Sequence, residues 1–583
     1  MKLVHFSGLE RNLNCSKYNN IILSWNLSNI YKISKKQNIF YISKFWQKNK
    51  IKIKKDITKI RNNLLSQLRR ELNFINKVNY STEEWEILLE HWLHEYLQNS
   101  YFKWLLIEDL IINYKNFKYL EIKVKKELPV FDTLQFFRLS QNNDIFNHLA
   151  FQDILKFKNK TKHKIILKNK VFQIQEKNIH RDYLKKKNNF FILLFEKLIS
   201  KIFENKILIN IRTKKINFLK LCFALKILPF KGLDVFDRKK LIEFSNNQKF
   251  DRKKRSLIKL YSKKNMNFTN YIFSKIRYDL PRIFIEDFYN IKNLHKNKLS
   301  KTKIVVSDTL HEFDPIFKSW LAVRKNSDKK FKIITTDHGG IYGTGNRIYD
   351  FNKTISSINF IYQKKVAQNQ IKLPCLFLDK EKISFTNKIL VISRDLPKYP
   401  KHFLTGPVCE EINSEFLNVQ NFLKNIELRL KKKTYIRPSN HISGWRLNKK
   451  YEKIVGANKT IYSNDDYNKL RSKAYIKIIT YPQTAFLECV INGPTFLLFD
   501  KKFYSDTKIN EKFMNILFKN KIAFNDGKDL ALHINNIEKD IDIWWKQRKI
   551  QKSLNLFIKN TNNYNENPIL TWADNLKKIL NKI

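Results

Sequence analysis

The chain has 583 residues, which excludes a single ordinary hydrophobic core and predicts about two to four domains. Its 43% hydrophobic and 14% aromatic content predicts a globular protein. A formal net charge of +59 is typical of partners such as nucleic acid or an anionic membrane, but here the lysines are scattered over the whole length, which indicates a compositional drift at solvated positions.

The sequence predicts neither a structural metal nor a membrane span. The five cysteines are widely separated and form no CxxC pair, which predicts a reduced, cytosolic setting without structural zinc. Residues 1–8 lack the apolar stretch of a signal peptide and are expected to form a buried strand. The longest apolar run, Phe190 to Phe195, is far shorter than the roughly 20 residues that cross a bilayer, so any membrane association is expected to be peripheral.

Residues up to about 300 are expected to be mainly helical. Short strand-like runs at 21–23 and 39–42 precede a basic helical pattern that ends near Arg70. Ser81 and Glu84 then form a capping box for a helix whose aromatic face is interpreted as core rather than as a platform for ligands. Residues 140–300 are basic, with few turn signals, and are expected to form a helical insert.

Two short basic motifs within that insert, 236–240 and 250–255, share an FDRKK pattern that is too short to count as a repeat. They have two interpretations. One is a solvated face or an attraction to anionic lipid and phosphate, and the other is a dedicated groove for a polyanion.

From Lys303 onward the pattern changes to alternating strands and helices. Residues 304–306 and 331–336 are expected to be strands, and Asp314 is expected to cap a helix that begins at Pro315. A second series follows a linker near 365–387, with strands expected at 388–392, 434–438, 475–480 and 495–499 and a helix at about 484–491.

Strands that alternate with short helices form parallel sheets, so the fold class is α/β, with two Rossmann-like domains facing a cleft. The expected boundaries are an N-terminal, acceptor-side domain over 1–375 with the helical insert, a C-terminal, donor-binding domain over 385–536, and a helical tail over 537–583.

The first candidate site is a glycine loop directly after the strand at 331–336. Four of the 11 glycines lie there: Gly339, Gly340, Gly343 and Gly345. Their order is neither GxGxxG nor a Walker A sequence, which makes a mononucleotide P-loop a poor interpretation. Glycines at a strand end let a ligand approach the backbone closely. We expect His338 to act as a general base on an acceptor hydroxyl, oriented by Asp337; the alternative is that His338 only bonds the turn.

The second candidate site is the helix at 484–491, in which Glu488 is the only charge. A carboxylate on a mostly buried helix needs a partner, because an unpaired buried charge costs several kcal/mol. Thr484 is expected to cap this helix and to touch a phosphate at its amino end. Arg437, at a neighbouring strand end, suits a diphosphate or a sugar carboxylate. The alternative is a structural Glu488 that pairs with Arg437 or another base.

Motifs over most of the chain resemble the transferases encoded in loci for O-antigen and other surface-carbohydrate biosynthesis. They are Leu72-Asn73, Ser81, Trp85 to Leu89, Trp92-Leu93, Leu280-Pro281 with Glu286, residues 317–322, His338-Gly339-Gly340 with Tyr342-Gly343, Arg437 with Gly444-Trp445, Thr484 with Leu487-Glu488, Asn492 with Pro494-Thr495, and Trp544-Trp545. The chain departs from that pattern at Asp337, Asn76 and Glu90-His91, and shortly after the glycine loop.

That family is similar to the GT-B glycosyltransferases, which implies two Rossmann-like domains and a donor held mostly by the second. It also implies no obligatory metal and no cofactor beyond a nucleotide-sugar co-substrate. The implied protein is cytosolic and peripheral to the inner membrane face, and it transfers a sugar from the nucleotide to a lipid-linked glycan acceptor of O-antigen or capsule type. Arg437, Thr484 and Glu488 would hold the donor. Two alternatives remain: transfer of a non-sugar group to surface glycans, and a protein without enzymatic activity that binds polyanions or nucleic acid.

Overall fold

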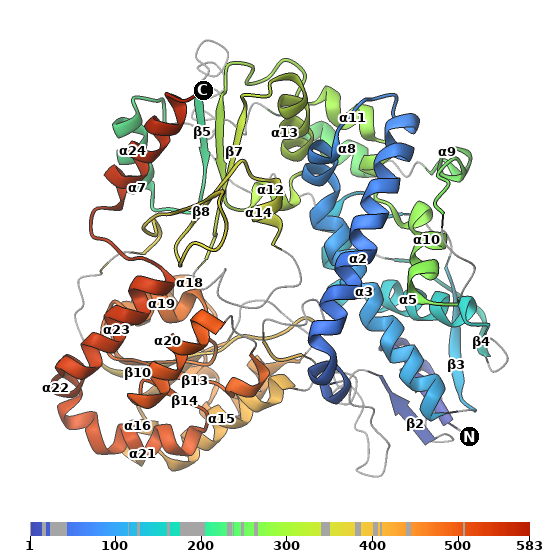
Figure 1. Cartoon of the computed structure of the whole chain (residues 1–583). Helices are drawn as coiled ribbons and strands as arrows, with labels where there is room; N and C mark the ends of the chain where they lie inside the picture. Colours follow the sequence, from blue (N-terminus) through green and yellow to red (C-terminus); the bar gives the residue numbers. More distant parts are fainter. Residues whose placement is uncertain are drawn as a thin grey trace.

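Three parallel β-sheets organise the computed structural model of this chain (Figure 1). The structure describes residues 2–13, 19–23, 43–114, 116–124, 129–159, 164–174, 205–229, 236, 238–246, 250–261, 266–339, 350–378, 380, 386–399, 406–408, 411–438, 445–504 and 508–583.

The first sheet is four-stranded and was not expected from the sequence. Its order is β2-β1-β3-β4, and all of its pairs are parallel. The strands are β1 (Lys2–His5), β2 (Asn19–Ile22), β3 (Lys118–Val124) and β4 (Lys164–Phe172). The buried strand expected at the start of the chain is therefore confirmed.

The second and third sheets are each five-stranded and parallel, and they confirm the α/β class with two Rossmann-like units. The second sheet has the order β5 (Ile207–Asn210), β6 (Ile304–Ser307), β7 (Lys332–Thr336), β8 (Ile358–Ile361) and β9 (Gln370–Lys372). The third has the order β11 (Thr434–Arg437), β10 (Thr386–Ile392), β12 (Ala474–Ile479), β13 (Thr495–Leu498) and β14 (Ala523–Phe524). Their apolar runs are buried on both faces, as parallel sheets require.

Two long helices stand beside the sheets (Figure 1). They are α2 (Ser43–Ile75) and α3 (Thr82–Asn113). The capping box of Ser81 and Glu84 is present at the start of α3, as expected, and Trp85 and Trp92 of its aromatic face are fully buried.

The stretch expected to be a helical insert also contains strands. Its helices are α5 (Asp144–Phe157), α7 (Lys215–Leu225), α8 (Arg238–Asn246), α9 (Arg252–Ser256), α10 (Phe268–Asp279) and α11 (Phe288–Asn293). However, β4 and β5 also lie within 140–300, and β5 is an edge strand of the second sheet. A four-residue apolar run such as β5 does not show enough periods to separate strand from helix. The run at 39–42 lies outside the described residues.

The remaining helices surround the sheets. They are α4 (Thr133–Asn142), α12 (Leu310–Phe313), α13 (Pro315–Ser327), α14 (Phe351–Ile355), α15 (Ile412–Asn425), α16 (Leu428–Lys431), α17 (Leu447–Val455), α18 (Asn464–Lys473), α19 (Thr484–Val490), α20 (Lys508–Lys519), α21 (Gly527–Ile537), α22 (Ile541–Lys546), α23 (Arg548–Thr561) and α24 (Pro568–Leu580). Asp314 caps α13 as expected, through the backbone N–H of Phe317. Within the described ranges, we find no helix whose length and hydrophobicity would let it span a bilayer.

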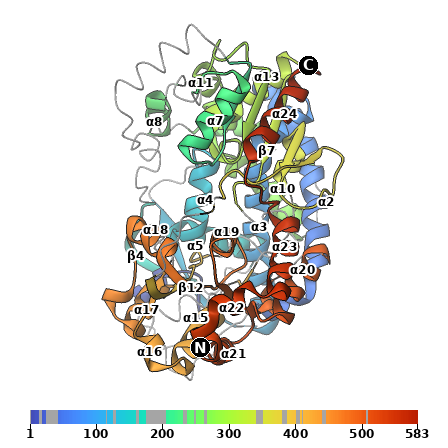
Figure 2. The same ribbon diagram turned by 90° about the vertical axis from the view of Figure 1, so that its left-hand side faces the viewer.

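The C-terminal helices connect the third sheet back to the second. From α23 the chain passes to α24, which packs on α7 beside the second sheet (Figures 1 and 2). Trp572 of α24 is fully buried; its indole N–H donates to the carbonyl oxygen of Pro374 at 2.7 Å, and its ring meets Phe360 of β8 edge to face. The end of the chain thus ties the two sheets together.

We predict that Trp572→Ala destabilises the protein by about 3–5 kcal/mol, because it removes a large buried side chain and leaves a cavity between α24 and β8. Urea unfolding measures the loss, and limited trypsin digestion should cleave near α24 first. Leu570→Ala, at a side chain on the same helix that is 64% exposed, is the matched control and should behave as wild type. Equal stability of the two variants would contradict the conclusion that Trp572 joins α24 to the second sheet.

Candidate active site

Polar residues follow the strands of the second sheet at one edge. Arg212 lies just after β5, Asp308 after β6, Asp337 and His338 after β7, and Tyr362 after β8. Because the strands are parallel, their carboxyl ends share this edge, where open α/β sheets bind ligands. The backbone N–H of Arg212 donates to Asp308 Oδ2 at 2.5 Å, which connects two of these strand ends directly.

The start of the loop after β7 is held by Tyr362, which directly follows the neighbouring strand β8. The Tyr362 hydroxyl donates to the backbone carbonyl oxygen of Asp337 at 2.9 Å, and the Thr336 hydroxyl donates to Tyr362 at 3.2 Å. Asp337 is buried and His338 is half-buried. Of the loop glycines predicted to approach a ligand, Gly339 is described, whereas Gly340 and Gly343 lie outside the described residues.

A second histidine lies in the buried layer close to His338. The Nε2 atom of His311 is 2.7 Å from Asn352 Oδ1 and its Nδ1 atom is 3.0 Å from the Ser307 hydroxyl. An amide oxygen only accepts, so Nε2 carries the proton and Ser307 donates to Nδ1. Burial lowers the pKa of His311 to about 4, and the charges of Lys318 and His338 act in the same direction. His311 is therefore a neutral support that presents no charge to His338 near neutral pH.

The two α/β units meet at Gly339. A Cβ atom at Gly339 would lie 2.5 Å from Thr484 Oγ1, at the start of α19 in the third sheet's unit. Real Cβ atoms essentially never lie that close to another atom, so a side chain at residue 339 would force the Thr484 hydroxyl or the loop to shift. Asp337 and Glu488 also share an electrostatic neighbour, the Cys375 thiol. Burial raises the pKa of Cys375 well above its usual range, and the charges of both carboxylates raise it further. The predicted residues Asp337, His338, Gly339, Thr484 and Glu488 thus lie around one junction.

Glu488 is held by two arginines from opposite sides of that junction. Arg212, from the second sheet, lies 3.3 Å from Glu488 Oε1, and Arg471 of α18 lies 2.7 Å from Oε2. The pairing agrees with the alternative in which Glu488 pairs with a base, and the bases are Arg212 and Arg471. The prediction that Thr484 caps α19 was wrong: Gln483 occupies the N-cap position and Thr484 is the first helical residue. The reason is that the turn after β12 extends to residue 483 before helical geometry begins.

Arg437 supports the neighbouring loop. Its Nη1 atom donates to the carbonyl oxygens of Ile461 and Tyr462, at 2.9 and 2.7 Å, and its Nη2 atom donates to Asn464 Oδ1 at 2.8 Å. The guanidinium groups of Arg437 and Arg471 both stack on the ring of Tyr467, at 5.2 and 5.8 Å from its centre. Tyr467 therefore connects Arg437 with the Arg471–Glu488 pair.

Sequence reasoning missed a further polar group at the carboxyl edge of the third sheet. Arg394, after β10, donates to Glu415 at 2.9 Å and to the Tyr504 hydroxyl at 2.6 Å, and Thr480, after β12, donates to Glu415 at 3.2 Å. Arg394 could have been found from the strand at 388–392, because it follows the strand end. Arg212 could not, because its strand was read as helix.

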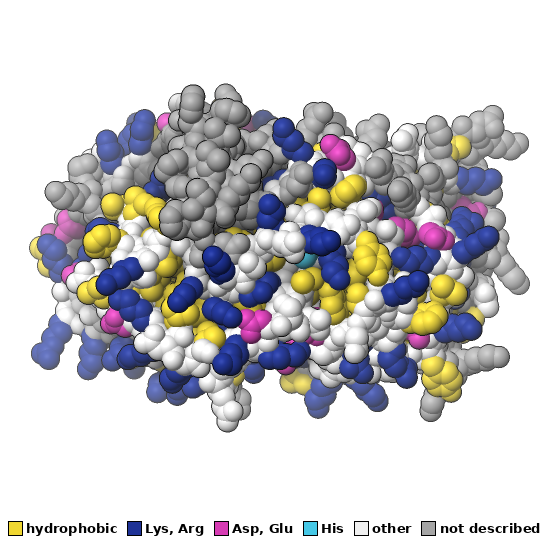
Figure 3. All heavy atoms as spheres, turned by 90° about the horizontal axis from the view of Figure 1, so that it is seen from above, with side chains coloured by type: hydrophobic (Ala, Val, Ile, Leu, Met, Phe, Trp, Pro, Cys, Tyr) yellow, Lys and Arg dark blue, Asp and Glu magenta, His cyan; other side chains and the backbone are white. Residues whose placement is uncertain are grey.

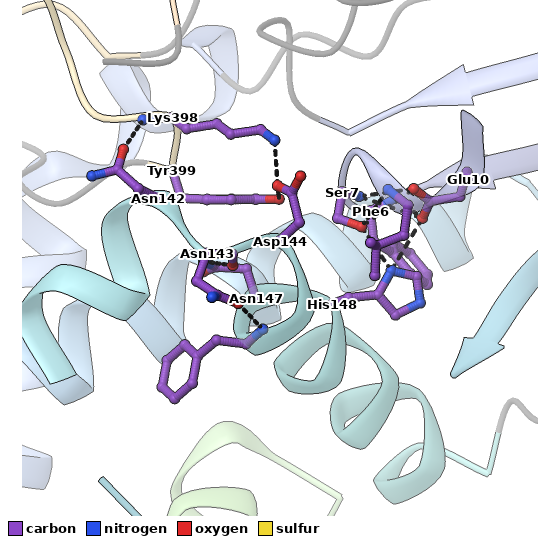
Figure 4. Close-up of polar contacts among 12 residues, drawn as sticks. Phe6, Ser7, Glu10, Asn142, Asn143, Asp144, Asn147, His148, Lys398 and Tyr399 are labelled. Carbon is purple, nitrogen blue, oxygen red and sulfur yellow. Dashed lines mark hydrogen bonds and ion pairs between the residues drawn. The ribbon is translucent and has the colours of Figure 1, made fainter. Parts of the chain in front are cut away.

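A separate polar cluster lies at the first sheet (Figure 4). His148 Nδ1 lies 2.9 Å from the Ser7 hydroxyl and 3.3 Å from Glu10, while Nε2 bonds the Leu120 carbonyl oxygen at 2.8 Å. A nucleophilic triad needs Ser and the acid on different ring nitrogens, and here both meet Nδ1. All three side chains are at most 1% exposed, so the cluster has a structural role.

Beside that cluster, the loop after β10 packs on the N-terminal half of the chain (Figure 4). Lys398 and the Tyr399 hydroxyl both bond Asp144 at the start of α5, and the Tyr399 backbone N–H donates to the Gln141 carbonyl oxygen at 2.9 Å. The contacts of Lys398 and Tyr399, together with α24, hold the third sheet's unit against the rest of the chain at two separated places.

The LIC12162 family transferase model matches residues 7–576, nearly the entire chain. The chain belongs to this family of transferases. None of the curated proteins matches it.

Among the solved structures that match this chain are two distantly similar ones. One is from Listeria monocytogenes and is assigned as a UDP-N-acetylglucosamine 2-epimerase; it is 11% identical, over 65% of this chain and 98% of that one, with a TM-score of 0.34. The other is the wall teichoic acid polymerase TagF, 10% identical over 49% of this chain and 74% of that one, with a TM-score of 0.29.

We predict that Gly339→Ala destabilises the protein by about 1–3 kcal/mol, because its methyl group would overlap Thr484 Oγ1. In a Thr484→Ala background, the nearest remaining atom is the residue 484 Cβ, 3.8 Å away, so the same change should cost less than about 0.5 kcal/mol. A double-mutant cycle by urea unfolding measures this coupling. Additive effects would show that the two residues do not meet.

We also predict that His311 stays neutral as the pH falls from 7.5 to 5. Its pKa of about 4 lies below the ordinary value of 6.5, so the unfolded chain takes up the proton first, and the contribution of His311 to stability is lost as the pH falls from about 6.5 towards 4. The C2 resonance of selectively labelled histidine, assigned with His311→Gln, reports the charge. A midpoint near 6.5 would contradict the burial.

Proposed function

We propose that this transferase moves a sugar from a nucleotide-activated donor to the lipid-linked precursor of a surface polysaccharide of O-antigen or capsule type. The observation that supports the proposal is the contact of Gly339 with Thr484, because the loop that carries His338 then lies beside the helix that carries Glu488. Glu488 pairs with Arg212 and Arg471, which together with Arg437 we call the arginine cluster. Family membership supports group transfer, and the paired parallel sheets support a nucleotide co-substrate.

In this proposal His338 accepts the proton of the acceptor hydroxyl while that oxygen attacks the anomeric carbon of the donor. Asp337, whose backbone is fixed by Tyr362, positions the imidazole. The bond from the sugar to the nucleotide diphosphate breaks, and the diphosphate leaves with the bonding electrons.

The donor side is proposed to use guanidinium groups and a hydroxyl. Arg471 and Arg212 converge on Glu488, which orients both, and Arg437 stands behind them on Tyr467. Guanidinium groups offer paired N–H donors that match phosphate oxygens. Thr484 would add a hydroxyl at the junction. We propose that these residues neutralise the diphosphate without a metal ion.

A cytosolic enzyme at the inner membrane face fits a nucleotide donor and a lipid-linked acceptor. Transfer of a non-sugar group, such as a phosphoalditol, would use the same junction and the same arginines. The mass added to the acceptor separates the two reactions.

We predict that a nucleotide sugar raises the melting temperature of the wild type more than that of Arg437→Ala or Glu488→Ala. Binding at about 100 times Kd adds about 2.7 kcal/mol of stability, which loss of the arginine support reduces. A thermal-shift screen of UDP-, GDP-, CDP- and dTDP-sugars measures this. Arg429→Ala, on the same unit and exposed between Glu427 and Glu538, is the matched control. A wild type that responds only to oligonucleotide, with steep salt dependence, would instead support polyanion binding.

For His338→Gln we predict transfer slower by about 10²- to 10⁴-fold, with donor stabilisation unchanged, because the substitution removes the base but leaves the arginine cluster. Mass spectrometry of the extended acceptor measures the rate. Full activity of this variant would assign the histidine to the turn alone.

A further inference from the structure

The basic motif at 250–255 divides into inward and outward side chains. Arg255 is fully buried: its Nε and Nη2 atoms bond Glu286 at 2.7 and 2.8 Å, and Nη1 donates to the backbone carbonyl oxygens of Arg277 and Tyr278. Lys254 donates to the Ile285 carbonyl oxygen at 2.7 Å. These bonds fix α9 on the end of α10, while Arg252 and Lys253 remain exposed on the outer side.

Large apolar side chains are exposed around that basic pair. Leu257 is 49% exposed, Tyr261 78% and Tyr278 42%. The segment is firmly held, since the Gln67 side chain of α2 bonds both the backbone N–H and the carbonyl oxygen of Tyr261. We define the α9 patch as Arg252, Lys253, Leu257, Lys259, Tyr261 and Tyr278. A fixed surface that combines cations with exposed apolar side chains is typical of a membrane interface.

The α9 patch also borders a cavity. A cavity of about 660 Å³ lies between α3, α5 and α10, and Arg252, Lys253 and Tyr278 line one side of it. Inside the cavity, Lys275 forms ion pairs with both Asp153 and Asp279. Much of the remaining wall is aromatic or aliphatic, with Phe136, Phe146 and Leu149 among its residues. The surface beside the basic pair is therefore concave and amphipathic.

The patch lies away from the reactive junction. In Figure 1, α9 is at the outer edge of the molecule, on the side opposite α22 and α23. Lysine and arginine are spread over the face of the molecule that Figure 3 shows, so charge alone does not distinguish this patch. The exposed apolar side chains and the adjoining cavity do.

We propose that the α9 patch docks the protein on an anionic phospholipid bilayer, with Arg252, Lys253 and Lys259 on the headgroup phosphates and Leu257, Tyr261 and Tyr278 in the interface. Each cation near such a surface strengthens binding severalfold, and tyrosine rings favour the headgroup level. This inference deepens the proposed function, since a lipid-linked acceptor would be presented at that bilayer, but docking itself requires no donor chemistry.

The test is sedimentation of the full chain with vesicles of phosphatidylcholine alone or with 30% phosphatidylglycerol, at 150 mM NaCl. We expect binding to the anionic vesicles. Arg252→Glu/Lys253→Glu and, separately, Leu257→Ser/Tyr261→Ser should each weaken it by about tenfold or more. The matched control is Arg548→Glu/Lys549→Glu, an exposed Arg-Lys pair in the first turn of α23, which should change binding by less than twofold.

Equal losses for the α9 and α23 charge pairs would show attraction by net charge alone and overturn the proposal, as would unchanged binding of the apolar variant. Circular dichroism establishes that each variant is folded. The thermal response to nucleotide sugar is measured on the same variants. Docking lost with the donor response intact confirms the patch, while absence of the donor response in wild type counts against the proposed transfer and not against docking.

Discussion

The structure depends on one close approach, that of the Gly339 backbone to the Thr484 side chain. A Cβ atom at residue 339 would lie 2.5 Å from Thr484 Oγ1, so the Thr484 side chain or the loop would have to move to admit one. Because each residue follows a strand of a different sheet, this contact fixes how the carboxyl edges of the second and third sheets face each other. Every polar group assigned to the candidate site takes its position from that arrangement.

Electrostatics around the junction follow from it. Glu488 carries one negative charge between Arg212 and Arg471, and one arginine comes from each unit. A partly buried carboxylate with two guanidinium partners avoids the cost of an unpaired charge and leaves a net positive site. On the other side, His311 is buried and neutral near pH 7, so His311 itself adds no positive charge beside His338. The junction therefore combines a cationic wall with a titratable imidazole.

Local signals predicted much of this fold. The continuous apolar runs of β6, β7, β10 and β13, and the caps at Ser81 and Asp314, are properties of a few consecutive residues, and the sequence shows them directly. The first strand, β1, was expected, but its assembly into a sheet was not, because β1 pairs with β3 more than a hundred residues away. Arg212 and Glu488 are 276 residues apart, so their pairing follows from tertiary structure alone. The sequence indicated that Glu488 needed a base, but the choice of base depended on how the sheets meet.

The most direct test of the shared junction is hydrogen–deuterium exchange. It is measured in the presence of the nucleotide sugar that gives the largest stabilisation. We expect peptides covering 332–339 and 480–490 to become protected together, although they belong to different sheets. Protection of one peptide without the other, or of neither while the donor binds, would contradict a site built from both.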